Sequence, residues 1–220
     1  MIHFQDVSKH YETHTALRKI SFSIEKGEMV FITGPSGSGK TTLLKLIYVA
    51  EKPDEGNITV SEWETHKLRE SQIAMFRRHI GVVFQDFRLL DNRNIFENVA
   101  LALRIRGMDE KVLKARVFES LKIANLRHKS DSYPQTLSGG EQQRVSIARA
   151  IVSEPMIVLA DEPTGNVDPE TSEGIMKTFK DINARGSTIL IATHNRDLFR
   201  ESGRRVFKLD SGNFLGEEVG

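Results

Sequence analysis

The sequence predicts an α/β fold with a mostly parallel sheet, an antiparallel β edge subdomain and a helical subdomain. Two observations carry this prediction. Short apolar runs bounded by turn residues alternate with helical patterns along much of the 220-residue chain, as expected for strands buried between helices. A central stretch shows helical periodicity and no convincing strand. A chain of this length can bury a substantial core within one domain.

The expected core strands are rich in Val, Ile, Leu and Phe, the composition of strands buried on both faces. We place them at residues 29–33, 80–84, 157–160 and 188–193, and expect a further apolar strand at residues 2–7. The helical patterns between them cover residues 40–48, 141–153 and 170–184. Because strands and helices alternate in this order, the sequence favours a parallel sheet covered by helices.

Turn signals and helical spacing define the two smaller parts. Residues 21–24 and 57–60 lie beside EKGE and KPDEG, which predicts antiparallel hairpins at a sheet edge. Residues 95–106 and 110–124 are expected to be helices, the second with Leu113, Val117 and Leu121 on one face. We therefore expect one domain, with a core at residues 1–86 and 138–220 and a helical subdomain at residues 87–137. The tail, SGNFLGEEVG, is expected to be loosely ordered.

Composition limits the classes of function. The 31 Lys and Arg residues balance 30 Asp and Glu residues, so the overall charge gives no reason to expect nucleic-acid binding. The absence of cysteine excludes disulfides and thiolate metal sites and fits a reducing compartment. The first residues lack a secretory-signal pattern, and no apolar run approaches the roughly 18 residues of a membrane span. We expect a cytoplasmic chain whose membrane role, if it has one, comes through a partner.

A glycine-rich segment, GPSGSGKTT, follows the apolar run MVFIT and precedes the helical LLKLI. This setting fits the phosphate-binding pattern G-x-x-x-x-G-K-[ST], in which glycines let backbone N–H groups converge on phosphate oxygens. Lys40 is expected to reach the β and γ phosphates, and the Thr41 hydroxyl to bind Mg²⁺. The expected ATP-binding residues of this loop are Gly34, Pro35, Ser36, Gly37, Ser38, Gly39, Lys40, Thr41 and Thr42.

Two adjacent carboxylates follow the apolar run IVLA. Asp161 is expected to hold the metal through water, and Glu162 to polarise a water for attack on the γ phosphate. Such a pair is often only a solvated turn, and the phosphate loop is what favours the catalytic interpretation. The expected reaction is hydrolysis of ATP to ADP and phosphate.

The segment LSGGEQQR has the features of a second anion site. Ser138 is a typical N-cap, Gly139 and Gly140 leave the backbone open, and a strong helix former follows. Gln142 belongs to the same expected site. Because one chain offers one such nucleotide loop, the simplest arrangement is a head-to-tail homodimer. Ser138 and Gly140 of one chain would close over the γ phosphate held by Lys40 of the other.

Together, the phosphate loop, LSGGEQQR and IVLADEPTGNVD resemble the nucleotide-binding domain of ABC ATPases over essentially the whole chain. The resemblance implies the ABC ATPase fold, with a P-loop NTPase core. It also implies that Tyr11 stacks on adenine and that Asp168 lies in a loop crossing the dimer interface. Gln85 would contact Mg²⁺ and the attacking water, and His194 the γ phosphate.

In this family the segment after the glutamine helps form a groove for a membrane protein, here Phe87, Arg88, Leu89 and Leu90. The strings GEMVFITGPSGSGKTTLLKLI, FQDFRLL, LSGGEQQR and DEPTGN together are most similar to the cell-division branch of the family. This resemblance implies an integral membrane partner, attachment to the inner face of the cell membrane, and regulation of peptidoglycan hydrolysis. The same side chains could also be ordinary subdomain core.

Two other functions stay open on the sequence. One is the ATPase subunit of a lipoprotein-releasing or macrolide-type exporter. The other is a DNA-repair or chromosome-structure clamp, which would carry a long heptad insertion between the phosphate loop and LSGGE. The present insertion shows no sustained heptad pattern, so no nucleic-acid partner is expected.

Overall fold

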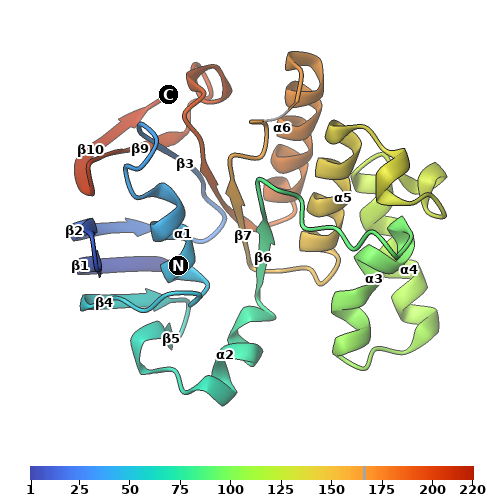
Figure 1. Ribbon diagram of the computed structural model, residues 1–220, viewed down its shortest axis with the longest axis horizontal. Helices are drawn as coiled ribbons and strands as arrows, with labels where there is room; N and C mark the ends of the chain where they lie inside the picture. Colours follow the sequence, from blue (N-terminus) through green and yellow to red (C-terminus); the bar gives the residue numbers. More distant parts are fainter. Residues whose placement is uncertain (166) are drawn as a thin grey trace. The chain divides into compact units, whose positions relative to one another are not determined.

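The computed structural model describes residues 1–165 and 167–220. They form two compact units. Unit 1 consists of residues 1–78 and 188–220, and unit 2 of residues 79–187. Figure 1 labels the helices and strands of both. Within the described ranges, no helix is both long and apolar enough to cross a membrane.

Unit 1 is built mainly of strands. Strands β2, β1, β4 and β5 form an antiparallel sheet in that order. In a second set, β8 and β9 pair in parallel with the two sides of β3, and β10 pairs antiparallel with β9. The elements are β1 (Ile2–Tyr11), β2 (His14–Ile24), β3 (Met29–Thr33), α1 (Lys40–Ile47), β4 (Glu55–Val60), β5 (Trp63–Glu64), a 3₁₀ helix (Thr65–Lys67), α2 (Glu70–Arg77), β8 (Thr188–Ala192), a 3₁₀ helix (Arg196–Leu198), β9 (Arg205–Asp210) and β10 (Asn213–Val219).

An aromatic cluster joins the two sets of strands in unit 1. The ring centroid of Phe22 on β2 lies 4.5 Å from that of Phe4 on β1 and 4.9 Å from that of Phe207 on β9. Phe214 on β10 lies 5.5 Å from Phe207. The expectation of a loosely ordered tail is therefore wrong, because β10 pairs with β9 and anchors an aromatic ring in this cluster.

Unit 2 combines a parallel strand pair with four helices in its described residues. Strands β6 and β7 pair in parallel, with Ile80 opposite Ile157 and Val83 opposite Ala160. The elements are β6 (Ile80–Val83), α3 (Ile95–Ile105), α4 (Glu110–Ile123), two 3₁₀ helices (Arg127–Lys129 and Pro134–Thr136), α5 (Gly139–Ile151), β7 (Ile157–Asp161) and α6 (Pro169–Ala184).

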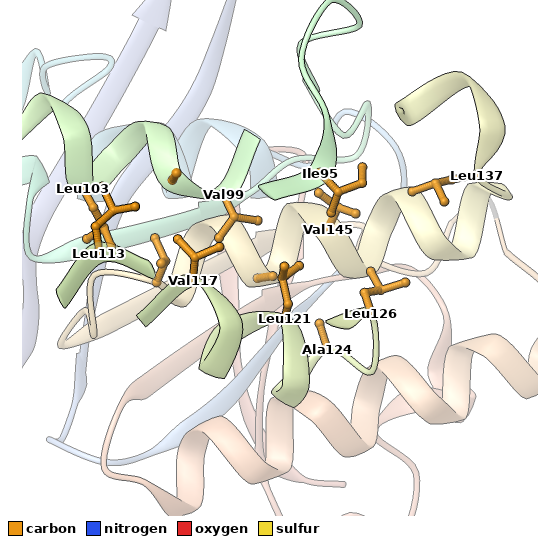
Figure 2. Packing of buried hydrophobic residues seen from close by; sticks show 13 residues of the cluster. Ile95, Val99, Leu103, Leu113, Val117, Leu121, Ala124, Leu126, Leu137 and Val145 are labelled. Carbon is orange, nitrogen blue, oxygen red and sulfur yellow. The ribbon is translucent and has the colours of Figure 1, made fainter. Parts of the chain in front are cut away.

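Side chains of α3, α4 and α5 form one hydrophobic core, in which Leu103, Val117 and Val145 are fully buried. Figure 2 shows these side chains pointing toward one another from the three helices. Full burial of one Leu or Val contributes about 1.5–3 kcal/mol, so this core holds α5 firmly against α3 and α4. Helices α3 and α4 lie within residues 87–137, while the limits of the helical subdomain stay a prediction.

Candidate active site

The phosphate loop lies in unit 1 between β3 and α1, as the sequence predicts. Gly39, the N-cap of α1, has a φ of 104°, and a Cβ built there would lie 2.5 Å from the Ala16 carbonyl oxygen. Only glycine fits such a position. The Lys40 ammonium reaches back over the loop and donates to the carbonyl oxygens of Gly34 at 2.8 Å and Pro35 at 3.0 Å. It is thus held where the loop would receive phosphate.

Other groups of the loop fit an anion. No side chain in the described part of the structure caps α1, so the backbone N–H groups of its first turn point out of the helix start. The Ser38 hydroxyl is buried and has no hydrogen-bond partner among the described residues. Because an unsatisfied buried hydroxyl is costly, a bound phosphate would supply a partner that the chain does not. Ser36, Gly37 and Thr41 are exposed, and Thr42 is half-buried.

The structure brings His194 and the phosphate loop together. The Thr193 N–H donates to the Ile32 carbonyl at 2.9 Å, which ties the segment after β8 to the end of β3. Gly34, Pro35 and His194 then line one open pocket of about 640 Å³. The contact between His194 and the γ phosphate stays a prediction that this placement supports.

Tyr11 ends β1 and is half-buried. Its ring lies 5.5 Å from the ring of His14, and the Lys9 ammonium lies 5.6 Å from its centroid. These neighbours position the ring locally, and stacking on adenine stays a prediction.

In unit 2, the predicted carboxylates lie at the end of β7. Asp161 is its last residue, and Glu162 follows with a φ of 46°, an uncommon conformation for a residue other than glycine. Gly165 lies beside Glu162 and Gln85, since a Cβ built on it would be 3.7 Å from the Glu162 Cβ and 3.8 Å from the Gln85 Nε2. Two residues predicted to act on the attacking water, from segments far apart in sequence, are therefore near each other.

Ser138 caps α5 through a reciprocal capping box. Its Oγ accepts the Glu141 N–H at 3.3 Å, and the Glu141 carboxylate accepts the Ser138 N–H at 2.9 Å. Accepting this bond leaves the Ser138 hydroxyl proton able to donate to an anion. Lys129 binds the other Glu141 oxygen at 2.5 Å. This ammonium, and then the Ser138 N–H, hold the pKa of Glu141 below its ordinary value.

Thr171 connects the starts of α5 and α6. A Cβ built on Gly140 would lie 2.4 Å from the Thr171 Cγ2, so any larger residue at position 140 would have to displace the Thr171 side chain. The Thr171 hydroxyl and N–H donate to the Asp168 carboxylate at 2.6 and 2.9 Å, which makes Asp168 the N-cap of α6. These bonds lower the pKa of Asp168. The structure thus links Gly140 and Asp168, which were predicted for the trans site and the dimer interface.

Sequence reasoning missed Thr171 and Lys129. The Asp-Pro-x-Thr spacing from position 168 is a typical N-cap signal that would have pointed to Thr171. No comparable local signal marks Lys129, which lies 12 residues before Glu141. Gln142 in the same helix start donates from Nε2 to the Leu137 carbonyl at 3.2 Å, and Gly139 is the first residue of α5.

The predicted partner segment follows β6 without forming a helix or strand. Leu89 packs against the hydrophobic core of α3, α4 and α5, as the ordinary-core interpretation expects. Arg88 and Leu90 are exposed, and Phe87 is half-buried. The Arg88 guanidinium lies 4.0 Å from the Phe84 ring centroid and pairs with Asp86 at 3.1 Å. The segment therefore offers one basic and one apolar side chain at the surface.

These features fit an anion-binding loop, and comparison with known proteins gives the class of the protein. The chain belongs to the ABC transporter family, which its residues 17–165 match. It is an ABC ATPase, an enzyme that hydrolyses ATP to ADP and phosphate. The α/β fold predicted from the sequence is confirmed. The structure matches the ATP-binding cassette MJ0796 in a dimeric post-hydrolysis state bound to ADP and phosphate, with a TM-score of 0.92, 37% identity, and coverage of 100% of this chain and 98% of that one.

The sequence is also similar to individual members of the family. The cell division ATP-binding protein FtsE of Bacillus subtilis is 48% identical over 99% of this chain and 96% of the relative. FtsE of Escherichia coli is 44% identical over 98% of both chains. The structure of CbiO1 of Clostridium perfringens, described as part of the ABC transporter complex CbiONQ, has a TM-score of 0.91 at 30% identity and covers 98% of this chain and 87% of that one.

Proposed function

We propose that the chain is the ATPase subunit of a bacterial cell-division complex. It would bind ATP and Mg²⁺, close as a head-to-tail homodimer, and drive an integral membrane partner of the FtsX type that regulates peptidoglycan hydrolysis. The observation that supports this most directly is the identity of 42–48% to several proteins named FtsE over 98–99% of the chain. The same proposal places the chain on the cytoplasmic face of the membrane through its partner.

The donor types at the proposed metal site suit Mg²⁺. The Thr41 hydroxyl, the Gln85 amide oxygen and the Asp161 carboxylate are oxygen ligands, which this cation prefers. Bound Mg²⁺ would neutralise charge on the β and γ phosphates. The chain itself would supply Glu162 to accept a proton from the attacking water, and Lys40 and His194 to donate to the charge that develops on the γ phosphate.

The proposed dimer gives the trans residues their role. MJ0796 cassettes, which share this fold at 37–38% identity, have been solved as dimers. In the present chain, the exposed Ser138 hydroxyl and the start of α5 offer an anion site. This site is separate in sequence from the phosphate loop, so it would be free to bind a nucleotide held by a second chain. Contact between Gly140 and Thr171 would pass closure at this site to Asp168, which we assign to the dimer interface.

Photocrosslinking from the partner segment tests the proposal. Because the chain has no native cysteine, Arg88→Cys can carry a single photocrosslinker in cells. We expect it to capture an FtsX-type membrane protein, since position 88 is exposed in the segment assigned to the partner. Lys122→Cys, at an exposed position on α4, is the matched control and should not capture that protein.

Each alternative predicts a different outcome of this experiment. Capture of an exporter permease from position 88 would replace the cell-division role by a lipoprotein-releasing or macrolide-type one. Equal capture from positions 88 and 122 would show that residues 87–90 are not the partner groove. Repeated recovery of no membrane protein would overturn the membrane-coupled function as a whole.

A further inference from the structure

The segment after β6 has a backbone that its own residues do not favour. Phe87 and Arg88 are consecutive residues with φ of 54° and 52°, in the left-handed region that L-residues with a side chain rarely adopt. Such a conformation persists only where surrounding structure holds it in place. The side chains that hold Phe87 and Arg88 in this conformation therefore help to set the shape of the segment.

Two polar side chains from other elements hold the carbonyl groups of this segment. Asn98 on α3 is 1% exposed, accepts the Leu90 N–H at 2.8 Å, and donates to the Leu90 and Arg93 carbonyls at 3.1 and 3.0 Å. Arg149 on α5 donates from one guanidinium nitrogen to the Phe87 carbonyl at 2.6 Å and from the other to the Arg88 carbonyl. The two strained residues are thus both bound by a single side chain.

Arg149 is well suited to this task. The guanidinium is planar and presents fixed donors, so it can bind two successive carbonyls only in one relative orientation. Burial, and next the nearby Arg88 charge, lower the pKa of Arg149, yet a guanidinium stays protonated in proteins. Its charge then makes both bonds to the carbonyls charge-assisted and costly to break. The position of the Arg149 guanidinium therefore helps to fix the positions of the Phe87 and Arg88 carbonyls.

The same helix carries both Arg149 and the trans signature. Helix α5 begins at Gly139, directly after the Ser138 cap, and Arg149 lies about 15 Å further along it. Val145 and Ala148 fix the helix between these ends in the core shown in Figure 2. A displacement of the α5 start on closure around ATP would therefore reach the carbonyls of Phe87 and Arg88 through one rigid element.

We propose that Arg149 is a positioning residue that couples the signature helix α5 to the partner segment at residues 87–90. ATP-driven movement of Ser138 would be converted by Arg149 into a change of shape where the membrane partner binds. This inference takes two elements from the proposed function: the nucleotide that contacts Ser138 and the membrane partner that binds the segment. The structural link itself lies entirely within unit 2.

Hydrogen exchange in the full chain tests the coupling with Mg-ATP as the probe. In a Glu162→Gln background, we expect Mg-ATP to change the exchange of the amides of residues 86–90. Arg149→Met should raise their exchange about tenfold without nucleotide, because two carbonyl bonds are lost. It should also abolish the response of these amides to Mg-ATP, while ATP affinity stays unchanged. Arg149→Lys, which keeps the charge without the fork, should give an intermediate response.

Arg116→Met is the matched control, since Arg116 lies in unit 2 and pairs only with Glu154 at 3.3 Å in the ion pairs described. It should keep the normal exchange and response. Retention of the Mg-ATP response in Arg149→Met, or its absence in the unmutated Arg149 background, would overturn the coupling role. If Arg149→Met does not fold, Arg149→Lys decides: a reduced response to Mg-ATP supports the coupling role, and a full response overturns it. Loss of the response in the variants together with no membrane capture from position 88 would leave the coupling standing and reject the proposed partner.

Discussion

At the scale of single residues, Glu141 shows how the trans signature is held in shape. Its carboxylate binds the Lys129 ammonium and the Ser138 N–H at once, and both interactions favour the ionised form. A carboxyl whose folded pKa is lowered stabilises the fold at pH values above its unfolded pKa, near 4.3. That contribution is lost as the pH falls through the lower folded pKa.

We therefore predict that Glu141→Gln destabilises the chain at pH 7 by about 1 kcal/mol, and that the difference shrinks as the pH is lowered below about 4. The estimate is small because the side chains of Lys129 and Glu141 are 32% and 18% exposed, so that water weakens their attraction. Urea unfolding of both proteins at pH 7 and at acidic pH measures it. Glu119→Gln is the control, because its pair with Arg185 is more than half exposed and should contribute almost nothing. A constant difference across this pH range would contradict the assignment.

The candidate site was predictable where chemistry follows directly from residue type and spacing. The pattern around Lys40 and the N-cap at Ser138 are local signals, and the structure has a loop and a helix start there. Asn98 and Arg149 gave no such signal, because their partners are backbone carbonyls, which every residue carries. For Arg149 those carbonyls lie 61 and 62 positions away. Residues that act through backbone atoms are therefore hard to find from one sequence.

At the scale of elements, the contact between α5 and α6 depends on one missing methyl group. Gly140→Ala would gain helix propensity of about 1 kcal/mol, but its Cβ would lie 2.4 Å from the Thr171 Cγ2. Overpacking of this kind costs about 1–3 kcal/mol, and here it also displaces Thr171, which donates two hydrogen bonds to the N-cap Asp168. We predict net destabilisation of up to about 2 kcal/mol in denaturant unfolding, together with slower ATP hydrolysis.

Two further variants separate the clash from the general effect of alanine. In Gly174→Ala on α6, the new Cβ would meet no atom of the described residues within 4 Å, so the variant should be neutral or stabilising. Thr171→Ser removes the clashing methyl and keeps the hydroxyl that donates to Asp168. In the double variant Gly140→Ala/Thr171→Ser, the free energy of unfolding should return toward that of the unsubstituted chain. Additive losses in the double variant would show that the two residues do not meet as described.

The strands and helices were predictable to the extent that they bury a continuous apolar face. Residues 29–33 and 157–160 are buried strands at the positions expected from composition. Strand β10 was missed because its side chains are mostly exposed, so no apolar periodicity marks it. Its order comes from pairing with β9 and from the single ring of Phe214, which are tertiary contacts. Helix α5 starts two residues earlier than predicted, since its capping box admits glycines at the first turn.

At the scale of the whole molecule, binding and dimerisation should both appear in thermal unfolding. ATP at about one hundred times its dissociation constant stabilises the protein that binds it by about 2.7 kcal/mol, which for a chain of this length raises Tm by roughly 5–10 °C. Lys40→Ala should lose this ATP-induced shift, because the ammonium held by the loop carbonyls would no longer meet the phosphates. Lys45→Ala, on the same helix α1, should keep it.

Protein concentration separates a dimer from a monomer that merely binds ATP. If Mg-ATP joins two chains head to tail, slow hydrolysis in Glu162→Gln preserves the dimer, and Tm must then rise with the concentration of protein, because unfolding also dissociates the pair. We predict this dependence for Glu162→Gln with Mg-ATP and its disappearance with ADP. Glu173→Gln, an exposed residue on α6, should show no such dependence since it continues to hydrolyse ATP. A Tm of Glu162→Gln that is independent of concentration, with sedimentation showing only monomer, would mean that the start of α5 does not close over a nucleotide in trans.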